Sequence, residues 1–459
     1  MTSIAPEIFK AYDIRGIVDR TLTEDAAEAI GRGLATVGRH QGVKRFVVGR
    51  DGRLSGPRLA TALARGLTAA GVDVIDIGVV ATPMVYFATH LFGTGSGVMV
   101  TGSHNPPEYN GLKMMVAGDT LAAEAIQELR RVVERGKFAT GAGKVETADV
   151  AAPYLDRIAA DVKLARPMTI AVDCGNGSPG AFAPQLFRRL GCEVIELFCD
   201  VDGNFPNHHP DPSKPENLQD LIAELARTSA EVGLAFDGDG DRLGIVTKTG
   251  KIIYPDRQLM LFAADVLSRN PGAEIIFDVK CTRNLFAWIR QHGGKPLLWK
   301  TGHSLIKSKL KETGAPLAGE MSGHVFFKDR WYGFDDGMYA GARMLELLSR
   351  THDPSKMLES LPDSISTPEL NIALPKEGEN HALIAELQKS AKFEGSTGIN
   401  TIDGLRVDYP DGFGLMRASN TTPVIVLRFE ADSHAGLARI REDFRRVLEK
   451  ARPGLPVPS

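Results

Sequence analysis

The sequence predicts an α/β protein, with three similar mixed-sheet α/β domains and a smaller C-terminal α+β domain around one cleft. Two observations predict this fold class: a strand–helix–strand pattern that occurs three times, and a change near residue 364 to short strands joined by turns. The length of 459 residues suits about three domains of ordinary size. We expect the domains to span residues 1–150, 151–251, 252–363 and 364–459.

The repeated unit is an apolar strand, a helix-like stretch and a second strand that follows a glycine. Such a unit forms a right-handed parallel crossover. Chance similarity between ordinary α/β units is the alternative interpretation. The paired strands are expected at 45–51 and 71–76, at 169–173 and 191–196, and at 274–278 and 293–299.

Each copy then supplies one more apolar run, which ends in a loop rich in reactive side chains. Because ligands gather beyond the carboxyl ends of strands in such sheets, we expect the three loops to face a shared cleft. The run at 97–100 leads into 101–107, that at 232–236 into 237–242, and that at 315–318 into 319–324.

The C-terminal region has a different pattern of expected secondary structure. Strand-like runs at 404–409 and 424–429 are joined by short turns, and a helical pattern from 434 to 450 follows them. These features predict an antiparallel sheet with a covering helix. The stretches 141–146 and 362–368 are rich in turn formers and predict linkers.

The composition excludes several classes of protein. Apolar residues make up 43% of the chain, charged residues 24%, and the net charge is −3, so neither a nucleic-acid groove nor a polybasic membrane surface is indicated. The apolar runs are too short to cross a bilayer, and the first residues do not resemble a signal peptide. The four cysteines form no C-x-x-C pair and are typical of reduced thiols, which predicts a cytoplasmic protein.

Three carboxylates follow the apolar run at 232–236, at Asp237, Asp239 and Asp241. Clustered carboxylates repel one another unless a cation neutralises them, and oxygen ligands favour a hard metal ion. The calcium-loop pattern fails, because Arg242 and Lys248 stand where it requires Gly and Glu. The spacing therefore favours Mg²⁺, and a polar turn without a metal is the alternative.

Ser103 lies on a tight loop after a predicted strand, between Gly102 and His104. A serine so placed is either a nucleophile or an ordinary loop residue, and a metal site elsewhere favours the first interpretation. The G-x-S-x-G pattern of a hydrolase is absent, because residue 105 is Asn.

Two further loops carry polar groups suited to sugars and phosphates. Glu320, Ser322 and His324 alternate along one loop and offer hydrogen bonds to sugar hydroxyls. The segment 417–423 contains Arg417 among small polar residues, a pattern suited to phosphate and also to an ordinary hairpin turn.

One motif indicates a different class of protein. Residues 175–180 match G-x-G-x-x-G between a strand and a helix, and Glu196 lies near the distance expected for a dinucleotide site. A nicotinamide-dependent enzyme is therefore a second hypothesis. The phosphate-binding loop of nucleotide kinases is absent.

Four motifs in order, TGSHNPP, DGDGDR, GEMSGH and RASNTTP, give the chain its strongest likeness. With them, and with the segment 11–16, the chain resembles the α-D-phosphohexomutase family over essentially its whole length. Within that family it is most similar to the bacterial bifunctional members that act on mannose and glucose phosphates. The Met of GEMSGH favours these over the phosphoglucosamine mutases.

The resemblance implies a role for each matched residue. Ser103 would carry the phosphoryl group and, with Asp237, Asp239 and Asp241, would bind Mg²⁺. The residues implied around the reacting phosphate are Arg15, His104, Lys113, Arg242 and His324. Those implied in substrate binding are Tyr12, Lys280, His303, Glu320, Ser322, His324, Arg417, Ser419, Asn420 and Thr421, the last four clamping the phosphate that does not react.

The resemblance also implies the reaction, a reversible interconversion of hexose 1-phosphate and hexose 6-phosphate by a phosphoserine enzyme through a 1,6-bisphosphate. It implies an isomerase of carbohydrate metabolism that supplies polysaccharide precursors, with Mg²⁺ as cofactor and glucose 1,6-bisphosphate as activator. We expect a monomer whose partners are small sugar phosphates, with no nucleic acid and no membrane. A phosphoglucosamine mutase, a Mg²⁺-dependent sugar phosphatase and a non-catalytic sugar-phosphate protein remain alternatives.

Overall fold

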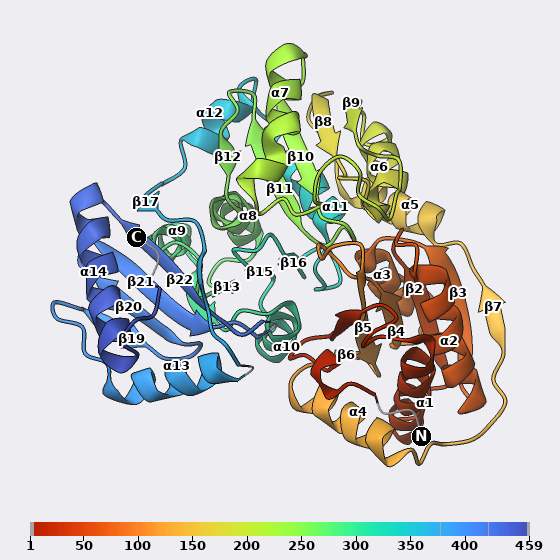
Figure 1. Ribbon diagram of the computed structural model, residues 1–459. Coiled ribbons are helices and arrows are strands. Elements are labelled where there is room, and N and C mark those ends of the chain that lie inside the picture. Colours follow the sequence, from red (N-terminus) through yellow and green to blue (C-terminus); the bar gives the residue numbers. More distant parts are fainter. Residues whose placement is uncertain (1–3, 377, 421, 457–459) are drawn as a thin grey trace.

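The computed structural model describes residues 4–376, 378–420 and 422–456 and contains four sheets, each with its own helices (Figure 1). The first unit and the last lie on opposite sides of the third. The predicted fold class is confirmed: three mixed-sheet α/β units and a smaller antiparallel one. No helix in the described part of the chain is long and apolar enough to span a bilayer.

The three repeated strands have the same order in each of the first three sheets. The last of the three pairs in parallel with the first, and an antiparallel strand lies outside the last. This order confirms the predicted repeat. The first sheet contains β1 (Ile14–Ile17), β2 (Arg45–Arg50), β3 (Asp73–Val79), β4 (Gly97–Val100), β5 (Tyr109–Val116), β6 (Asp119–Thr120) and β7 (Val145–Thr147). The second contains β8 (Thr169–Asp173), β9 (Glu193–Leu197), β10 (Val232–Phe236), β11 (Leu243–Thr247) and β12 (Ile252–Ile253), and the third β13 (Glu274–Asp278), β14 (Lys295–Trp299), β15 (Leu317–Gly319) and β16 (Val325–Phe327).

The helices begin and end where local signals place them. For example, the Thr23 side chain accepts a hydrogen bond from Ala26 N and caps the first helix, whose first turn is acidic and whose last turn is basic. The helices of the first two units are α1 (Glu24–His40), α2 (Gly56–Ala69), α3 (Thr82–Leu91), α4 (Glu124–Arg135), α5 (Ala151–Asp161), α6 (Ala183–Arg189) and α7 (Gln219–Arg227). Those that follow are α8 (Pro255–Arg269), α9 (Asn284–Gln291), α10 (His303–Thr313), α11 (Gly337–Leu348) and α12 (Pro354–Glu359), and three short 3₁₀ turns are η1 (Pro6–Ile8), η2 (Ser178–Ala181) and η3 (Pro215–Leu218).

The last unit is an antiparallel sheet, as predicted, and two helices accompany it where one was expected. Its final helix matches the expected 434–450 to within one residue. The unit contains β17 (Ile365–Ser366), β18 (Leu370–Ala373), β19 (Gly398–Asn400), β20 (Leu405–Tyr409), β21 (Gly412–Ala418), β22 (Val424–Ala431), α13 (Glu379–Ser390) and α14 (His434–Ala451).

One apolar core joins the first three units. It runs from Val47 on β2 through Leu234 on β10 to Phe277 on β13. Helix α11 follows the third sheet in the chain but packs on the second, where Gly341 leaves room for Phe187 and Leu234. The last unit has a separate core, and a small cluster of Val279, Phe413 and Leu415 links it to the third.

The two predicted linkers are not free segments. Residues 145–147 form β7, which pairs with β3 in parallel, and residues 365–366 form β17, which pairs with β22. Backbone polar groups that run beside an open sheet edge find their hydrogen-bond partners there, so turn-rich composition did not prevent strand formation. The division at residues 150, 251 and 363 stays a prediction.

Candidate active site

A cavity of about 1090 Å³ lies between the four units. Loops from all four sheets line it, as expected for strand ends that face one cleft. The predicted residues in its lining are Tyr12, Arg15, Ser103, His104, Lys113, Arg242, Lys280, His303, Glu320, Ser322, His324, Arg417, Ser419 and Asn420. Asp237, Asp239 and Asp241 are fully buried behind this lining, and Thr421 lies outside the described residues.

Ser103 follows β4 on a turn with a left-handed backbone, at φ 50°. This conformation is unfavourable for a residue other than Gly, so surrounding contacts must hold it. Ser103 N donates to Thr101 Oγ1 at 2.8 Å. The Ser103 Oγ lies 3.1 Å from Asp237 Oδ2 and 3.1 Å from His104 Nδ1. The turn thus directs the hydroxyl at the acidic loop.

His104 is held neutral next to this hydroxyl. Burial, together with the positive charges of Arg242 and Arg15, holds the pKa of His104 well below its usual value. A neutral imidazole has one nitrogen free to accept a hydrogen bond. His104 is therefore able to accept the proton of the Ser103 hydroxyl.

The acidic loop brings three buried carboxylates to the end of β10, with ligand atoms within 4.8 Å of one another. Lys113 from β5 donates to Asp239 Oδ2 at 2.7 Å and to Asp241 Oδ2 at 2.5 Å. Burial opposes ionisation of Asp239, but the charge of Lys113 outweighs it and lowers the pKa of Asp239. Burial and the neighbouring charges of Asp241 and Asp239 raise the pKa of Asp237. The charge of Lys113, with Arg242 Nε at 3.7 Å from Asp237 Oδ2, thus offsets only part of the charge of three carboxylates.

This loop fits a hard cation. Among the described residues, the buried Oδ1 atoms of Asp239 and Asp241 have no hydrogen-bond partner, and an unpaired buried acceptor is unfavourable. Oxygen donors of this kind are the ligands that Mg²⁺ takes in proteins.

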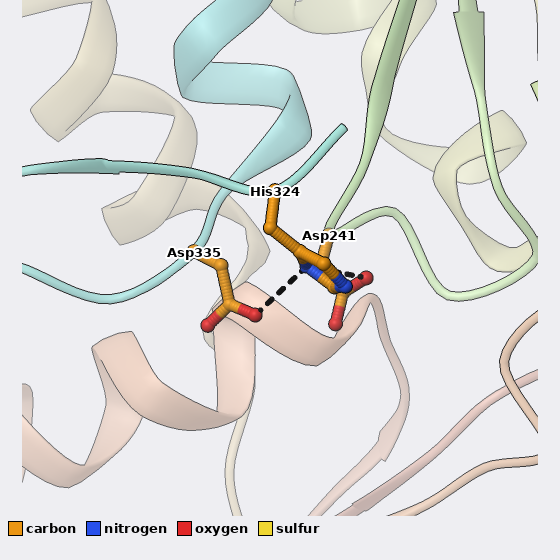
Figure 2. Close-up of side chains that lie close together, drawn as sticks. All are labelled: Asp241, His324 and Asp335. Atoms are coloured by element: carbon orange, nitrogen blue, oxygen red, sulfur yellow. Dashed lines mark ion pairs between the residues drawn. The ribbon is translucent and has the colours of Figure 1, made fainter. Parts of the chain in front are cut away.

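A second group with metal-ligand geometry shares Asp241 and is less suitable (Figure 2). His324 lies between two carboxylates, with Nδ1 at 3.0 Å from Asp335 Oδ2 and 3.5 Å from Asp241 Oδ1. Arg242 Nε donates to His324 Nε2 at 3.1 Å, so Nε2 is the acceptor in this pair. Lys307 Nζ pairs with Asp335 Oδ1 at 2.8 Å. This group offers two carboxylates and an imidazole, whereas the 237–241 loop offers three carboxylates, so the loop is the better site for a hard cation.

The predicted sugar-binding residues lie between the acidic loop and the last unit. Gly302 N donates to the buried Glu320 Oε1 at 2.5 Å, and burial raises the pKa of Glu320. Burial and the charge of Lys307 hold the pKa of His303 well below its usual value. Lys280 Nζ pairs with Glu369 Oε2 at 3.1 Å. Ser322 lines the cavity on the same loop as Glu320.

The predicted phosphate loop of the last unit begins at the end of β21. Arg417 Nε donates to Asp403 Oδ2 at 3.0 Å, and the buried Arg417 Nη2 has no hydrogen-bond partner among the described residues. Asn420 donates to the Tyr12 hydroxyl, which donates to Thr301 O at 2.9 Å. Ser419 Oγ accepts from Thr422 N at 3.3 Å. These contacts connect the first, third and last units across the cleft.

Several residues that organise the site were not predicted. An aspartate ends or directly follows the first strand of each repeat, and all three accept from nearby loops: Asp51 from Thr101, Asp173 from Gly175 N, and Asp278 from Thr301. The repeat itself was the signal that could have found them. Thr82, which donates to Asp239 Oδ2 at 2.5 Å, and Asp335 have no comparable sequence signal.

The glycine-rich segment 175–180 supports the acidic loop. A Cβ on Gly177 would lie 2.7 Å from Gly238 Cα, and Ser178 N donates to Gly238 O at 3.0 Å. Close packing against the neighbouring loop explains these glycines without a dinucleotide.

Comparison with known proteins places these features in one family. Four descriptions of "Phosphoglucomutase/phosphomannomutase" match in order: alpha/beta/alpha domain I at residues 6–140, domain II at 152–250, domain III at 254–365 and the C-terminal domain at 369–447. A phosphoglucomutase of Neisseria gonorrhoeae is 63% identical over 451 residues, covering 98% of each chain. A phosphomannomutase/phosphoglucomutase of Pseudomonas aeruginosa is 57% identical over 457 residues, covering 99% of this chain and 98% of that one. A solved structure of a phosphoglucomutase/phosphomannomutase family protein from Burkholderia thailandensis is 61% identical, with a TM-score of 0.95 and full coverage of both chains.

Proposed function

Since this chain belongs to the phosphoglucomutase/phosphomannomutase family, we propose that it interconverts the 1-phosphates and 6-phosphates of mannose and glucose. The phosphoryl group moves from Ser103 to the free hydroxyl of the substrate. The 1,6-bisphosphate so formed turns end for end and returns its other phosphoryl group to Ser103. The enzyme is thus regenerated in its phosphorylated form.

One observation carries this proposal: residues suited to phosphate come from the first unit and from the last unit and line one cavity. Ser103 and Arg15 belong to the first unit, and Arg417 belongs to the last. A sugar phosphatase needs only the first of these. A second phosphate site is required when the intermediate must stay bound while it turns, so the geometry favours a mutase.

We assign the reacting end to Ser103 and the acidic loop. Asp237, Asp239 and Asp241, with an oxygen of the phosphorylated Ser103, would hold Mg²⁺, which supplies charge neutralisation for the phosphoryl oxygens. Lys113 pairs with Asp239 and Asp241 in the buried loop, and its charge lowers the pKa of Asp239. Phosphoryl transfer depends mainly on positioning and charge, so these residues need do little covalent chemistry themselves.

The remaining residues of the reacting end supply positive charge and a proton acceptor. Arg15 and Arg242 line the cavity beside Ser103 and suit the oxygens of the transferring group. His104 is a neutral ring at the same place. His324 lines the cavity, and its Nε2 accepts from Arg242 Nε.

We assign the other end to sugar and distal phosphate. Glu320, Ser322 and His303 offer hydrogen bonds to the ring hydroxyls, while Lys280 and Tyr12 border the path between the two ends. Arg417, Ser419, Asn420 and Thr421 clamp the phosphate that does not react. Arg417 Nη2 is the donor with a place left for a ligand.

The reaction scheme also assigns an activator. If the bisphosphate leaves before it returns a phosphoryl group, Ser103 remains a free hydroxyl and the enzyme stops. Glucose 1,6-bisphosphate restores it by transferring one phosphoryl group to Ser103 Oγ, and a hexose monophosphate departs. Since a single chain supplies all the assigned residues, we further propose a cytoplasmic monomer that binds small sugar phosphates, without nucleic acid or membrane.

Product analysis tests the proposed function. Glucose, mannose and glucosamine 1-phosphates are supplied in parallel with Mg²⁺ and a trace of glucose 1,6-bisphosphate, and ³¹P NMR follows the products. We expect the 6-phosphates of glucose and mannose and little inorganic phosphate. Free phosphate without isomerised sugar phosphate would support the phosphatase alternative. A clear preference for glucosamine 1-phosphate would support the phosphoglucosamine mutase alternative.

A further inference from the structure

Arg53 is buried directly behind the Ser103 loop, on the segment that follows β2. Its side chain is 1% exposed, and it does not line the cavity. A buried guanidinium is unfavourable unless its donors are paired.

All five N–H donors of this guanidinium have acceptors, four of them carbonyl oxygens of the Ser103 loop. A guanidinium offers five donors in a rigid fork, so its geometry fixes the positions of the groups that it binds. Nε donates to Asp51 Oδ2 at 3.2 Å, Nη2 to Ser103 O at 2.9 Å and Asn105 O at 2.5 Å, and Nη1 to Pro106 O at 2.6 Å and Tyr109 O at 2.9 Å.

Asp51 completes the attachment from the other side of the turn. Its Oδ2 accepts from Thr101 Oγ1 at 2.7 Å and from Gly102 N at 3.2 Å. Thr101 Oγ1 in turn accepts from Ser103 N. The left-handed backbone of Ser103 is thus held on both sides by the pair of Asp51 and Arg53.

The same guanidinium lies where the first and second units meet. The Phe205 ring of the second unit lies 5.1 Å from Arg53 Cζ. A Cβ on Gly238 in the acidic loop would lie 2.5 Å from Ser103 O. The carbonyl that Arg53 binds is therefore the one against which the acidic loop packs.

We propose that Arg53 is a positioning residue for Ser103: it holds the loop in the turn that places Ser103 Oγ opposite Asp237. The inference rests on the proposed function, because positioning matters only if Ser103 carries the phosphoryl group. Arg53 touches neither cavity nor substrate. Its loss should slow transfer at Ser103 and leave sugar-phosphate binding by the last unit intact.

The test compares Arg53→Lys with Arg50→Lys. Lysine keeps the charge but has three donors on a single atom, so it cannot bind the four carbonyls together. Arg50 is the last residue of β2, and its side chain pairs with Asp76 at 3.5 Å. We expect kcat of Arg53→Lys to fall about tenfold to a hundredfold, since small misplacements at a reacting group have effects of that size. KM for glucose 1-phosphate should change less than about twofold, and Arg50→Lys should match wild type.

Two further measurements separate this inference from the proposed function. Intact-mass spectrometry after rapid mixing with glucose 1,6-bisphosphate gives the rate of phosphorylation of Ser103 itself. Arg53→Lys should be phosphorylated slowly and wild type quickly. If wild type never carries the phosphate, the proposed function fails, whatever Arg53 does. In Arg53→Ala, added guanidinium should restore part of the rate, and the same concentration of ethylammonium should not.

The inference is overturned if Arg53→Lys is phosphorylated at the wild-type rate, or if its kcat falls only together with affinity for the sugar phosphate. Gly102→Ala serves as a second variant, because the added Cβ would lie 2.4 Å from Arg53 Cζ and displace the loop from the other side. It should show the same fall in kcat at constant KM. If no variant keeps the wild-type near-UV circular dichroism, Arg53 is a folding residue and the positioning role is rejected.

Discussion

The two ends of the cleft are built differently. At the reacting end, buried residues of the first unit bond the acidic loop of the second. Ser103 bonds Asp237, 134 positions away in the sequence, and Lys113 bonds Asp239, 126 positions away. At the other end, Arg417 is anchored through Asp403 within its own unit and keeps Nη2 without a described partner. Among the described residues, the first end thus leaves buried carboxylate oxygens of Asp239 and Asp241 for a cation, and the second leaves a donor for an anion.

The cores explain this difference. The first three units share one apolar core, so the loops at the reacting end are fixed relative to one another. The last unit has its own core and meets the third through a small cluster around Phe413. A fixed reacting end suits phosphoryl transfer, and a clamp on a separate unit suits an intermediate that presents each of its phosphates in turn. Four experiments test this contrast, from the largest expected effect to the smallest.

The largest effect is expected at Ser103. Ser103→Ala removes the phosphoryl acceptor, so turnover should fall by about four orders of magnitude or more. The phosphate adduct should also vanish from the intact mass. Ser268→Ala, on α8 and away from the cleft, provides the control. Near-normal turnover of Ser103→Ala with bisphosphate present would contradict the assignment.

Loss of the metal should have the next largest effect. Chelation should abolish activity and added Mg²⁺ should restore it, since three buried carboxylates with one lysine remain poorly neutralised. Wild type should gain about 2.7 kcal/mol of stability when Mg²⁺ is a hundredfold above its Kd, seen as a rise in Tm.

The matched variants are Asp241→Asn and Asp156→Asn, the second exposed on α5 and paired with Arg189. Only Asp241→Asn should lose both the activity and the Mg²⁺-dependent rise in Tm. Full activity of wild type in metal-free buffer, or an unchanged rise in Tm in Asp241→Asn, would exclude a metal at this loop.

A smaller effect is expected at the distal end. Arg417→Ala removes a charged hydrogen-bonding group, which is typically worth about 1.5–3 kcal/mol, so kcat/KM should fall about tenfold to a hundredfold. The fall should affect both reaction directions, and more 1,6-bisphosphate should escape into solution. Arg439→Ala, on the exposed face of α14, is the control. A loss confined to one direction would rule out a clamp that serves both ends.

The smallest effect concerns the loop that supports the acidic residues. Burial lowers the pKa of His208, but its hydrogen bond to Asp173 at 3.0 Å outweighs burial and raises it above the usual 6.5. A raised folded-state pKa gives stability that is fully present below pH 6.5 and is lost as pH rises through the folded-state value.

The contribution of this group to the free energy of unfolding of wild type should therefore decrease between pH 6 and pH 8.5. Urea titrations at the two pH values should show a smaller decrease in His208→Gln. His292→Gln, exposed at the end of α9, should behave as wild type. Identical pH dependence of the free energy of unfolding in wild type and His208→Gln would show that His208 does not contribute to it.

The sequence by itself determined the repeated sheets, the final helix and the position of each chemically active loop. Strands and loops can be predicted from neighbouring residues, because apolar runs indicate buried strands and turn formers indicate the loops between them. Ser103, the three aspartates and Arg417 could thus be placed at strand ends before any contact was known. The repeat also contains Asp51, Asp173 and Asp278 at equivalent positions, although their role was not predicted from the sequence.

Only the tertiary structure decided how the charges are balanced. Lys113 reaches Asp239 and Asp241, Asp335 lies behind His324, and Arg53 supports the Ser103 loop. The shared core and the position of α11 on the second sheet were likewise decided by the tertiary structure alone. A buried charge is stabilised by whatever group packs against it, and that group comes from a distant part of the chain. No local pattern records such a pairing, so it follows from the packing of whole units.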